Sequence, residues 1–208
     1  MRLFIAVEFP EYIREEIARV QNRMKKTQDK IKWVDPASIH ITLKFLGEVR
    51  EERIEKILEV IEQTTGKVSP FTLKIEGTGA FPNITSPRVI WIGVKNVPSL
   101  DWLATELESA LEKEGFPREK RKWVPHLTVG RVKFLKERNK LRELILREKG
   151  SKIGKMEVKY VTLMQSHLTP KAPIYTPIKK FLLKGDKNEG REAKGFGDSQ
   201  TSDRTSIW

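Results

Sequence analysis

The chain has 208 residues, no cysteine, 33% charged residues and a formal charge of +12 at neutral pH. This composition is typical of a soluble globular protein. It excludes disulfides and thiolate metal sites and, because no apolar run approaches about 20 residues, a membrane-spanning helix. The N-terminal apolar run is also too short for a secretory signal, so we expect a cytoplasmic protein.

In the first half of the chain, strand and helix patterns alternate. Apolar residues recur at every second position over 3–7 and at every third or fourth position after Pro10, which predicts a strand and then a helix. An extended segment is predicted from Lys32 to Leu46. A helix over 54–66, ending near Gly66, and a strand from Phe71 complete this half.

The second half repeats this order. Residues 88–94 predict a strand, and Ser99 is predicted to cap a helix that ends at Gly115. The triplet Lys122-Trp123-Val124 then repeats Lys32-Trp33-Val34. The remaining predicted elements are an extended segment over 126–134, a helix over 141–150, a strand over 156–160 and a closing strand over 174–183.

The duplication predicts an α+β fold with two pseudo-symmetric lobes, each an antiparallel-rich sheet with two helices, which face each other across a central groove. We expect one domain over 1–184, with repeats of about 1–84 and 85–184 between which strands can be exchanged. Residues 185–208 have few apolar side chains and no periodicity, which predicts a disordered tail. That tail holds four basic and five acidic residues, so the basic surplus lies in the folded part.

This basic surplus favours a polyanionic partner, because Lys and Arg release counterions when they bind phosphates. A surface rich in Lys, Arg and Glu is also typical of heat-adapted proteins, so thermostability is an alternative explanation of the same composition.

Each half carries a His-x-Thr motif a few residues after its Lys-Trp-Val triplet: His40 and Thr42 in the first half, His126 and Thr128 in the second. Because successive side chains of a strand point to opposite faces, the His and Thr of each motif should share one face. Each lobe would then present one imidazole and one hydroxyl from a rigid strand.

Two imidazoles and two hydroxyls suit in-line displacement at a phosphodiester. Histidine titrates near ~6.5, so one imidazole can accept a proton from the nucleophile while the other donates one to the leaving oxygen. Threonine hydroxyls can hold the non-bridging phosphate oxygens. This chemistry requires neither metal nor cofactor, and a metallohydrolase is disfavoured because neither histidine has a nearby third ligand.

The third histidine also precedes a threonine, in His167-Leu168-Thr169-Pro170. No Lys-Trp-Val triplet precedes it, the first half has no matching motif, and Pro170 prevents a continuing central strand. We therefore interpret this third motif as coincidental and place His167 in a solvent-facing loop.

The segments His40–Gly47 and Pro125–Arg131, together with the N-terminal Arg2–Val7, resemble the two-histidine phosphoesterase superfamily. Within it the chain is most similar to the RNA 2′,3′-cyclic phosphodiesterases, also called 2′-5′ RNA ligases, from residue 1 to about 184. The resemblance implies an ATP-independent enzyme in which His126 is the proton acceptor and His40 the proton donor.

The same resemblance implies hydrolysis of RNA 2′,3′-cyclic phosphate ends to 2′-phosphomonoesters. With an RNA 5′-hydroxyl as nucleophile it also implies reversible 2′-5′ ligation of such ends, as in tRNA halves. The expected partner is RNA with 2′,3′-cyclic phosphate ends, and the protein is expected to be a monomer.

Basic residues near the motifs are predicted to bind substrate. Arg131 resembles the family arginine that neutralises phosphate charge, although strict alternation puts it on the face opposite His126 unless a bulge intervenes. Lys44, four residues after His40, is predicted to share the catalytic face. Trp33 and Trp123 are interpreted as packing residues, and Tyr175 is a further candidate.

Two alternatives from this stage use the same residues. One is an RNA-binding module that holds a phosphate without turning it over. The other is a phosphodiesterase that acts on small cyclic nucleotides or on ADP-ribose cyclic phosphate. The basic surplus of the folded part favours RNA over a small ligand.

Overall fold

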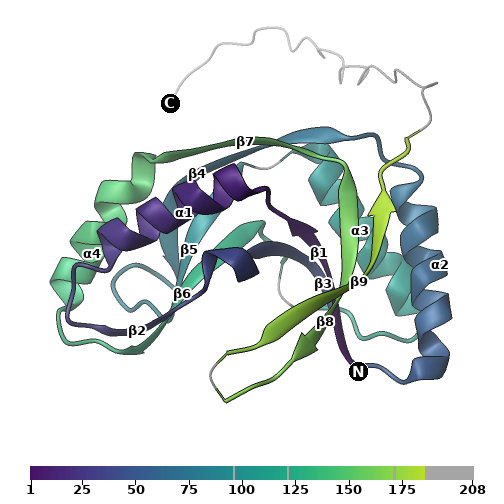
Figure 1. Ribbon diagram of the computed structural model, residues 1–208, viewed down its shortest axis with the longest axis horizontal. Helices are drawn as coiled ribbons and strands as arrows, with labels where there is room; N and C mark the ends of the chain where they lie inside the picture. Colours follow the sequence, from purple (N-terminus) through teal and green to yellow (C-terminus); the bar gives the residue numbers. More distant parts are fainter. Residues whose placement is uncertain (96, 121, 171, 186–208) are drawn as a thin grey trace, which may run out of the picture.

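The computed structural model describes residues 1–95, 97–120, 122–170 and 172–185, so the predicted tail from residue 186 onward lies outside the described residues. Four α-helices in this part of the chain accompany two antiparallel sheets (Figure 1). The helices are α1 (Glu11–Met24), α2 (Ile54–Thr65), α3 (Pro98–Lys113) and α4 (Arg138–Arg147). None of these helices has the length and apolar character needed to cross a membrane. The α+β class and the two-lobed arrangement are as predicted.

Nine strands form the two sheets within the described ranges. The four-stranded sheet has the order β3-β1-β8-β9, with β1 (Arg2–Glu8), β3 (His40–Glu48), β8 (Tyr160–His167) and β9 (Ile174–Leu182). The five-stranded sheet has the order β2-β6-β5-β4-β7, with β2 (Lys30–Trp33), β4 (Phe71–Phe81), β5 (Val89–Lys95), β6 (His126–Phe134) and β7 (Lys152–Val158).

The two halves of the chain exchange elements. Strand β4 of the first half pairs with β5, while β8 of the second half pairs with β1. Each helix layer also combines helices of both halves. Helix α1 packs with α4 on the five-stranded sheet, and α2 packs with α3 beside the four-stranded sheet (Figure 1). Each sheet and its helix layer therefore contain residues of both halves, so neither half can complete a core on its own.

Most predicted elements are present, with three corrections. The segment predicted from Lys32 to Leu46 is two strands in different sheets, because a short 3-10 turn (Pro36–Ser38) intervenes and the Asp35 carboxylate accepts the Ala37 N–H at 3.0 Å. The strand predicted over 156–160 is divided between β7 and β8. Helix α3 begins at Pro98 with Val97 as its N-cap, so Ser99 does not cap it. The triplet Lys122-Trp123-Val124 precedes its strand, as predicted, whereas Lys32 and Trp33 of its counterpart lie in β2.

The apolar stripes predicted for the helices are buried in one continuous core. In α1 this stripe also holds Gln21, which is fully buried and whose Nε2 donates to the carbonyl oxygens of Val34 at 2.8 Å and Val129 at 2.9 Å. A smaller apolar cluster of Phe4, Ala6 and Met164 is separate from this core. The four-stranded sheet is therefore apolar on both faces near its centre.

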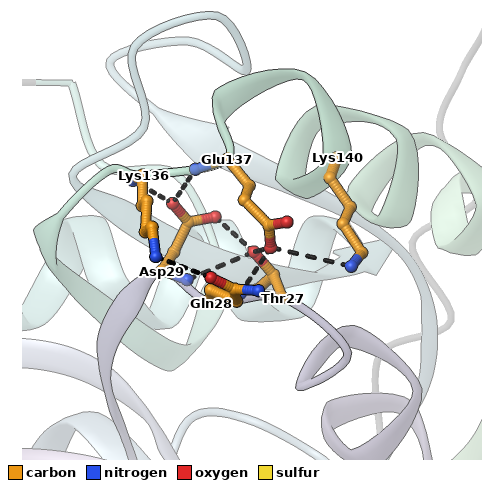
Figure 2. A network of polar contacts seen from close by, with 6 residues as sticks. All are labelled: Thr27, Gln28, Asp29, Lys136, Glu137 and Lys140. Carbon is orange, nitrogen blue, oxygen red and sulfur yellow. Dashed lines mark hydrogen bonds and ion pairs between the residues drawn. The ribbon is translucent and has the colours of Figure 1, made fainter.

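A polar network joins the loop after α1 to the start of α4 (Figure 2). Asp29 Oδ1 accepts the backbone N–H groups of Lys136 at 2.5 Å and Glu137 at 2.8 Å, and Asp29 Oδ2 accepts the Thr27 hydroxyl at 2.5 Å. Glu137 in turn accepts the backbone N–H of Gln28 at 2.6 Å. Asp29 thus fixes the backbone just before α4 from the other half of the chain.

Replacing Asp29 by Ala is expected to lower the free energy of unfolding by about 1–2 kcal/mol, because two backbone N–H groups just before α4 lose their acceptor. The measurement is urea unfolding followed by circular dichroism, with Glu143→Ala on exposed α4 surface as the control. Equal stability of the two variants would show that this network does not hold the halves together.

Candidate active site

The two motif histidines occupy equivalent positions. His40 begins β3 and His126 begins β6. Nδ1 of each ring lies within hydrogen-bond distance of the carbonyl oxygen two residues earlier, at 2.9 Å from Ser38 O and 2.7 Å from Val124 O. A neutral imidazole that donates from Nδ1 leaves Nε2 free as an acceptor, so Nε2 is the atom available for proton transfer in both motifs.

A β-bulge interrupts β3 one residue after Thr42. Ala6 of β1 pairs with Thr42 but Ile5 pairs with Lys44, so Leu43 is the extra residue. A second shift follows near Leu46, and Phe4 pairs with Phe45. Directly paired residues share a face. His40, Thr42 and Phe45 therefore lie on one face, with Glu8, Ala6 and Phe4 of β1 as their respective partners.

The bulge overturns the prediction for Lys44. Its side chain lies on the opposite, buried face and is only 1% exposed. Lys44 Nζ donates to Glu108 Oε1 of α3 at 2.6 Å and to the Pro117 carbonyl at 2.7 Å. The prediction for Lys44 assumed that side chains alternate between the two faces along a regular strand, and the bulge interrupts this alternation. Lys44 is a buried structural cation and not a substrate ligand.

The same bulge occurs in β6, where it supports the prediction for Arg131. Trp91 of β5 pairs with Thr128 and Ile90 pairs with Gly130, so Val129 is the extra residue. Its carbonyl is held by Gln21 and by the Val34 N–H at 2.9 Å. After this bulge Arg131 pairs with Val89 and shares the face of Thr128 and His126, where it is exposed. The first six residues of β3 and β6 consequently have the same sequence of exposed and buried side chains.

The two motif strands meet where the sheets adjoin. Strand β3 contacts β6, and Trp123 Nε1 donates to the Thr42 carbonyl at 3.0 Å. Tyr175 of β9 contacts the His40 ring edge-on at 5.0 Å, and it lies near enough to Arg131 for that charge to act on its phenol. The charge of Arg131 in one sheet therefore acts on a residue that contacts the histidine of the other.

Aromatic rings flank both histidines. Phe81 contacts His126 edge-on with ring centroids 5.0 Å apart, which matches the contact of Tyr175 with His40. The ring of Phe4 also packs against His40, with ring centroids 4.8 Å apart. Both imidazoles are therefore packed against aromatic rings.

Burial is the largest influence on His40 and lowers its pKa below the ordinary value, against the hydrogen bond to the Ser38 carbonyl and the charge of Glu8, which both act to raise it. Burial also raises the pKa of Tyr175, against the charges of Arg131 and Arg2, so its phenol is neutral at physiological pH.

Several site residues were not predicted from the sequence. Lys32 pairs with Arg131 across β2 and β6, which puts a second basic side chain on that face. Phe81 and Glu8 lie next to the histidines only because of strand pairing. Their positions depend on long-range register, for which the sequence contains no local signal.

The remaining sequence interpretations concern His167 and the tryptophans. His167 is the last residue of β8 and is exposed, so it lies at a strand end instead of in the predicted loop. Trp33 and Trp123 are partly buried against the main core, which confirms their interpretation as packing residues. Among the described residues, no group of three His, Asp, Glu or Cys side chains is arranged to hold a metal ion.

Comparison with known proteins agrees with this geometry. A family model described as LigT like Phosphoesterase matches residues 7–91 and again residues 92–175. The first match contains His40 and Thr42, and the second contains His126 and Thr128. The chain therefore belongs to the LigT-like phosphoesterases, and the predicted family and enzyme class are confirmed.

Individual relatives extend over nearly the whole folded part. An RNA 2′,3′-cyclic phosphodiesterase of Methanothermobacter thermautotrophicus is 41% identical over 183 residues, which is 88% of this chain and 99% of the relative. One of Methanocaldococcus jannaschii is 42% identical over 181 residues, 87% of this chain and 100% of the relative.

Solved structures show the same fold. The crystal structure of TT0787 of Thermus thermophilus has a TM-score of 0.77 at 30% identity and covers 89% of this chain and 100% of its own. Escherichia coli LigT complexed with 3′-AMP has a TM-score of 0.73 at 26% identity and covers 88% of this chain and 97% of its own.

Replacing Lys44 by Ala is expected to lower the free energy of unfolding by about 3 kcal/mol, because Glu108 loses the cation that compensates its partly buried charge. Lys133→Ala, which removes an exposed lysine of β6, is the control and should change stability by less than about 0.5 kcal/mol. The measurement is denaturant unfolding. A destabilisation no larger than that of the control would contradict the structural role of Lys44.

Proposed function

We propose that the protein hydrolyses RNA 2′,3′-cyclic phosphate ends to 2′-phosphomonoesters, with His126 as proton acceptor and His40 as proton donor. The observation that carries this proposal is the pair of equivalent motif strands, each with a free imidazole Nε2 and a threonine on one face, which meet where the sheets adjoin. The names of the relatives, RNA 2′,3′-cyclic phosphodiesterases, support the substrate.

The reaction is an in-line displacement. Nε2 of His126 takes a proton from a water molecule while the water oxygen attacks phosphorus. The bond between phosphorus and the 3′ oxygen breaks, and Nε2 of His40 donates its proton to that oxygen. The products are a 2′-phosphate and a 3′-hydroxyl, and the histidines exchange protonation states before the next turnover.

The other residues on the site face act on the phosphate. Thr42 and Thr128 donate hydrogen bonds to the non-bridging oxygens, and Arg131 neutralises the charge that develops on them. Lys32, which pairs with Arg131, adds positive charge where the RNA strand continues. No protein residue needs to form a covalent intermediate.

The same geometry supports further parts of the proposal. If an RNA 5′-hydroxyl replaces water, the displacement forms a 2′-5′ linkage, and its reversal cleaves that linkage, as expected for tRNA-half-like ends. We place these activities in one domain over 1–184, with repeats of about 1–84 and 85–184, in a monomer that acts in the cytoplasm.

One assay separates this function from its alternatives. An RNA oligomer with a 2′,3′-cyclic phosphate end is incubated with the protein, and the end is identified as a 2′- or a 3′-phosphate. Formation of a 2′-phosphate supports the proposal. Binding without turnover would instead indicate an RNA-binding module, and turnover of mononucleoside cyclic phosphates alone would indicate a small-molecule phosphodiesterase.

Replacing His40 or His126 by Ala is expected to reduce kcat at least about 100-fold, because each variant lacks one of the two proton-transfer groups. The matched control is His167→Ala, which removes the histidine of the third His-x-Thr sequence and should leave activity unchanged. EDTA should have no effect on wild-type activity. Substantial turnover by either motif variant would contradict the two-histidine mechanism.

Replacing Arg131 by Ala is expected to reduce kcat/KM about 10- to 100-fold through loss of a charged hydrogen-bond donor to the phosphate. Arg131→Lys should restore only part of this loss, because an ammonium cannot replace the planar fork of a guanidinium. Lys133→Ala, two residues further along β6, is the control. If both alanine substitutions reduce kcat/KM equally, Arg131 acts only through general charge.

A further inference from the structure

The two catalytic histidines share the same Nδ1 hydrogen bond and the same edge-on ring contact, but they differ in the residue paired with them across the sheet. His40 pairs with Glu8 of β1, whereas His126 pairs with Gly93 of β5. Paired residues of antiparallel strands lie about 5 Å apart at Cβ and share one face. One histidine therefore has a carboxylate as its neighbour, and the other has no side chain at this position.

The backbone enforces this difference. A Cβ atom at Gly93 would lie 2.7 Å from the Glu76 carbonyl oxygen, which is closer than packed atoms approach. No residue with a side chain fits there without a shift of β4. A carboxylate can therefore occupy this cross-strand position beside His40 but not beside His126.

Glu8 is fixed in place and ionised. Its Oε2 accepts the hydroxyl of Thr162 at 2.7 Å and pairs with Lys180 Nζ at 3.0 Å, and Thr162 itself is 1% exposed. Burial alone would raise the pKa of Glu8, but these hydrogen bonds and the charges of Lys180 and Arg14 outweigh it, so the pKa is lowered. The carboxylate keeps its negative charge throughout the neutral range.

The other titratable groups that act on His40, Tyr175 or Glu8 do not add a second negative charge beside His40. Tyr175 contacts His40 from β9 as a neutral phenol, and the charges of Arg2 and Arg131 act on it. Lys180 of β9 and Arg14 of α1 act on Glu8. Burial lowers the pKa of His40, and Glu8 is the charged group that acts against it.

We propose that Glu8 is a positioning residue whose charge opposes the effect of burial on His40 and favours its protonated form, so that His40 is the proton donor and His126 the acceptor. This inference rests on the proposed function. It explains how a site built from two equivalent motifs acquires a direction: the water proton goes to the histidine without a carboxylate, and the leaving oxygen receives its proton from the histidine beside one.

The test is the pH dependence of kcat/KM for Glu8→Gln, which keeps the size and the hydrogen bond to Thr162 but removes the charge. Because His40 then loses its proton at lower pH, the alkaline limb should move to lower pH and kcat/KM there should fall about fivefold. The acid limb should stay in place. A shift of the acid limb instead, or of neither limb, would overturn the proposal.

A second variant changes the profile in the opposite direction. Lys180 is 55% exposed, so Lys180→Met should fold normally. It removes the cation that partly neutralises Glu8, and the alkaline limb should therefore move to higher pH. A shift to lower pH would contradict the role of Glu8. Glu157→Gln on exposed β7 surface is the control for charge changes in general.

The imidazole NMR resonances of the unliganded protein test Glu8 without any substrate. Glu8→Gln should move the titration of His40 to lower pH and leave the His126 resonances as in wild type, with His167→Ala used for assignment. An unchanged His40 titration would overturn the proposal. If wild type fails to turn over cyclic phosphate RNA, the proposed function fails, while this measurement still decides the role of Glu8.

Discussion

The site depends on two matching β-bulges, one residue after the threonine of each motif. Without the extra residue in β6, Arg131 would lie on the core face beneath α1 and α4. Without its counterpart in β3, Lys44 would lie in the site and Phe45 in the core. The bulge in β6 is stabilised because the buried Gln21 and the Val34 N–H satisfy the Val129 carbonyl. A helix of the first half thus supports the reactive strand of the second.

Exchange of elements makes the site a property of the whole chain. Strand β4 of the first half pairs with β5, the first strand of the second half, and its Phe81 contacts His126. Strand β8 of the second half pairs with β1, the first strand of the first half, and with β9, whose Tyr175 contacts His40. These ring contacts join residues that are distant in the sequence, so the surroundings of the histidines depend on both sheets. Far from the site, hydrogen bonds from the backbone just before α4 to Asp29 also join the two halves of the chain.

The sequence was sufficient for the features that depend on local pattern. The repeated His-x-Thr, the apolar stripes of the helices and the α+β class follow from spacing alone. It was insufficient wherever pairing between distant strands decides the outcome. The faces on which Lys44 and Arg131 lie depend on the two bulges. The positions of Glu8 and Lys32 depend on their partners across the sheet. The division of residues 32–46 depends on a turn that directs its two strands to different sheets. Each of these is a tertiary effect that overrides local alternation.

A duplicated fold presents two copies of the same catalytic group, whereas an in-line displacement needs an acceptor on one side and a donor on the other. The sequence differences that separate the two sides are small. Phe45 stands where the other strand has Arg131, and Glu8 stands where the other sheet has Gly93, whose backbone neighbours exclude any side chain. Both differences lie outside the His-x-Thr motifs. In the proposed mechanism the motifs supply the reactive groups, and the strands paired with them determine which of the two imidazoles gives up its proton.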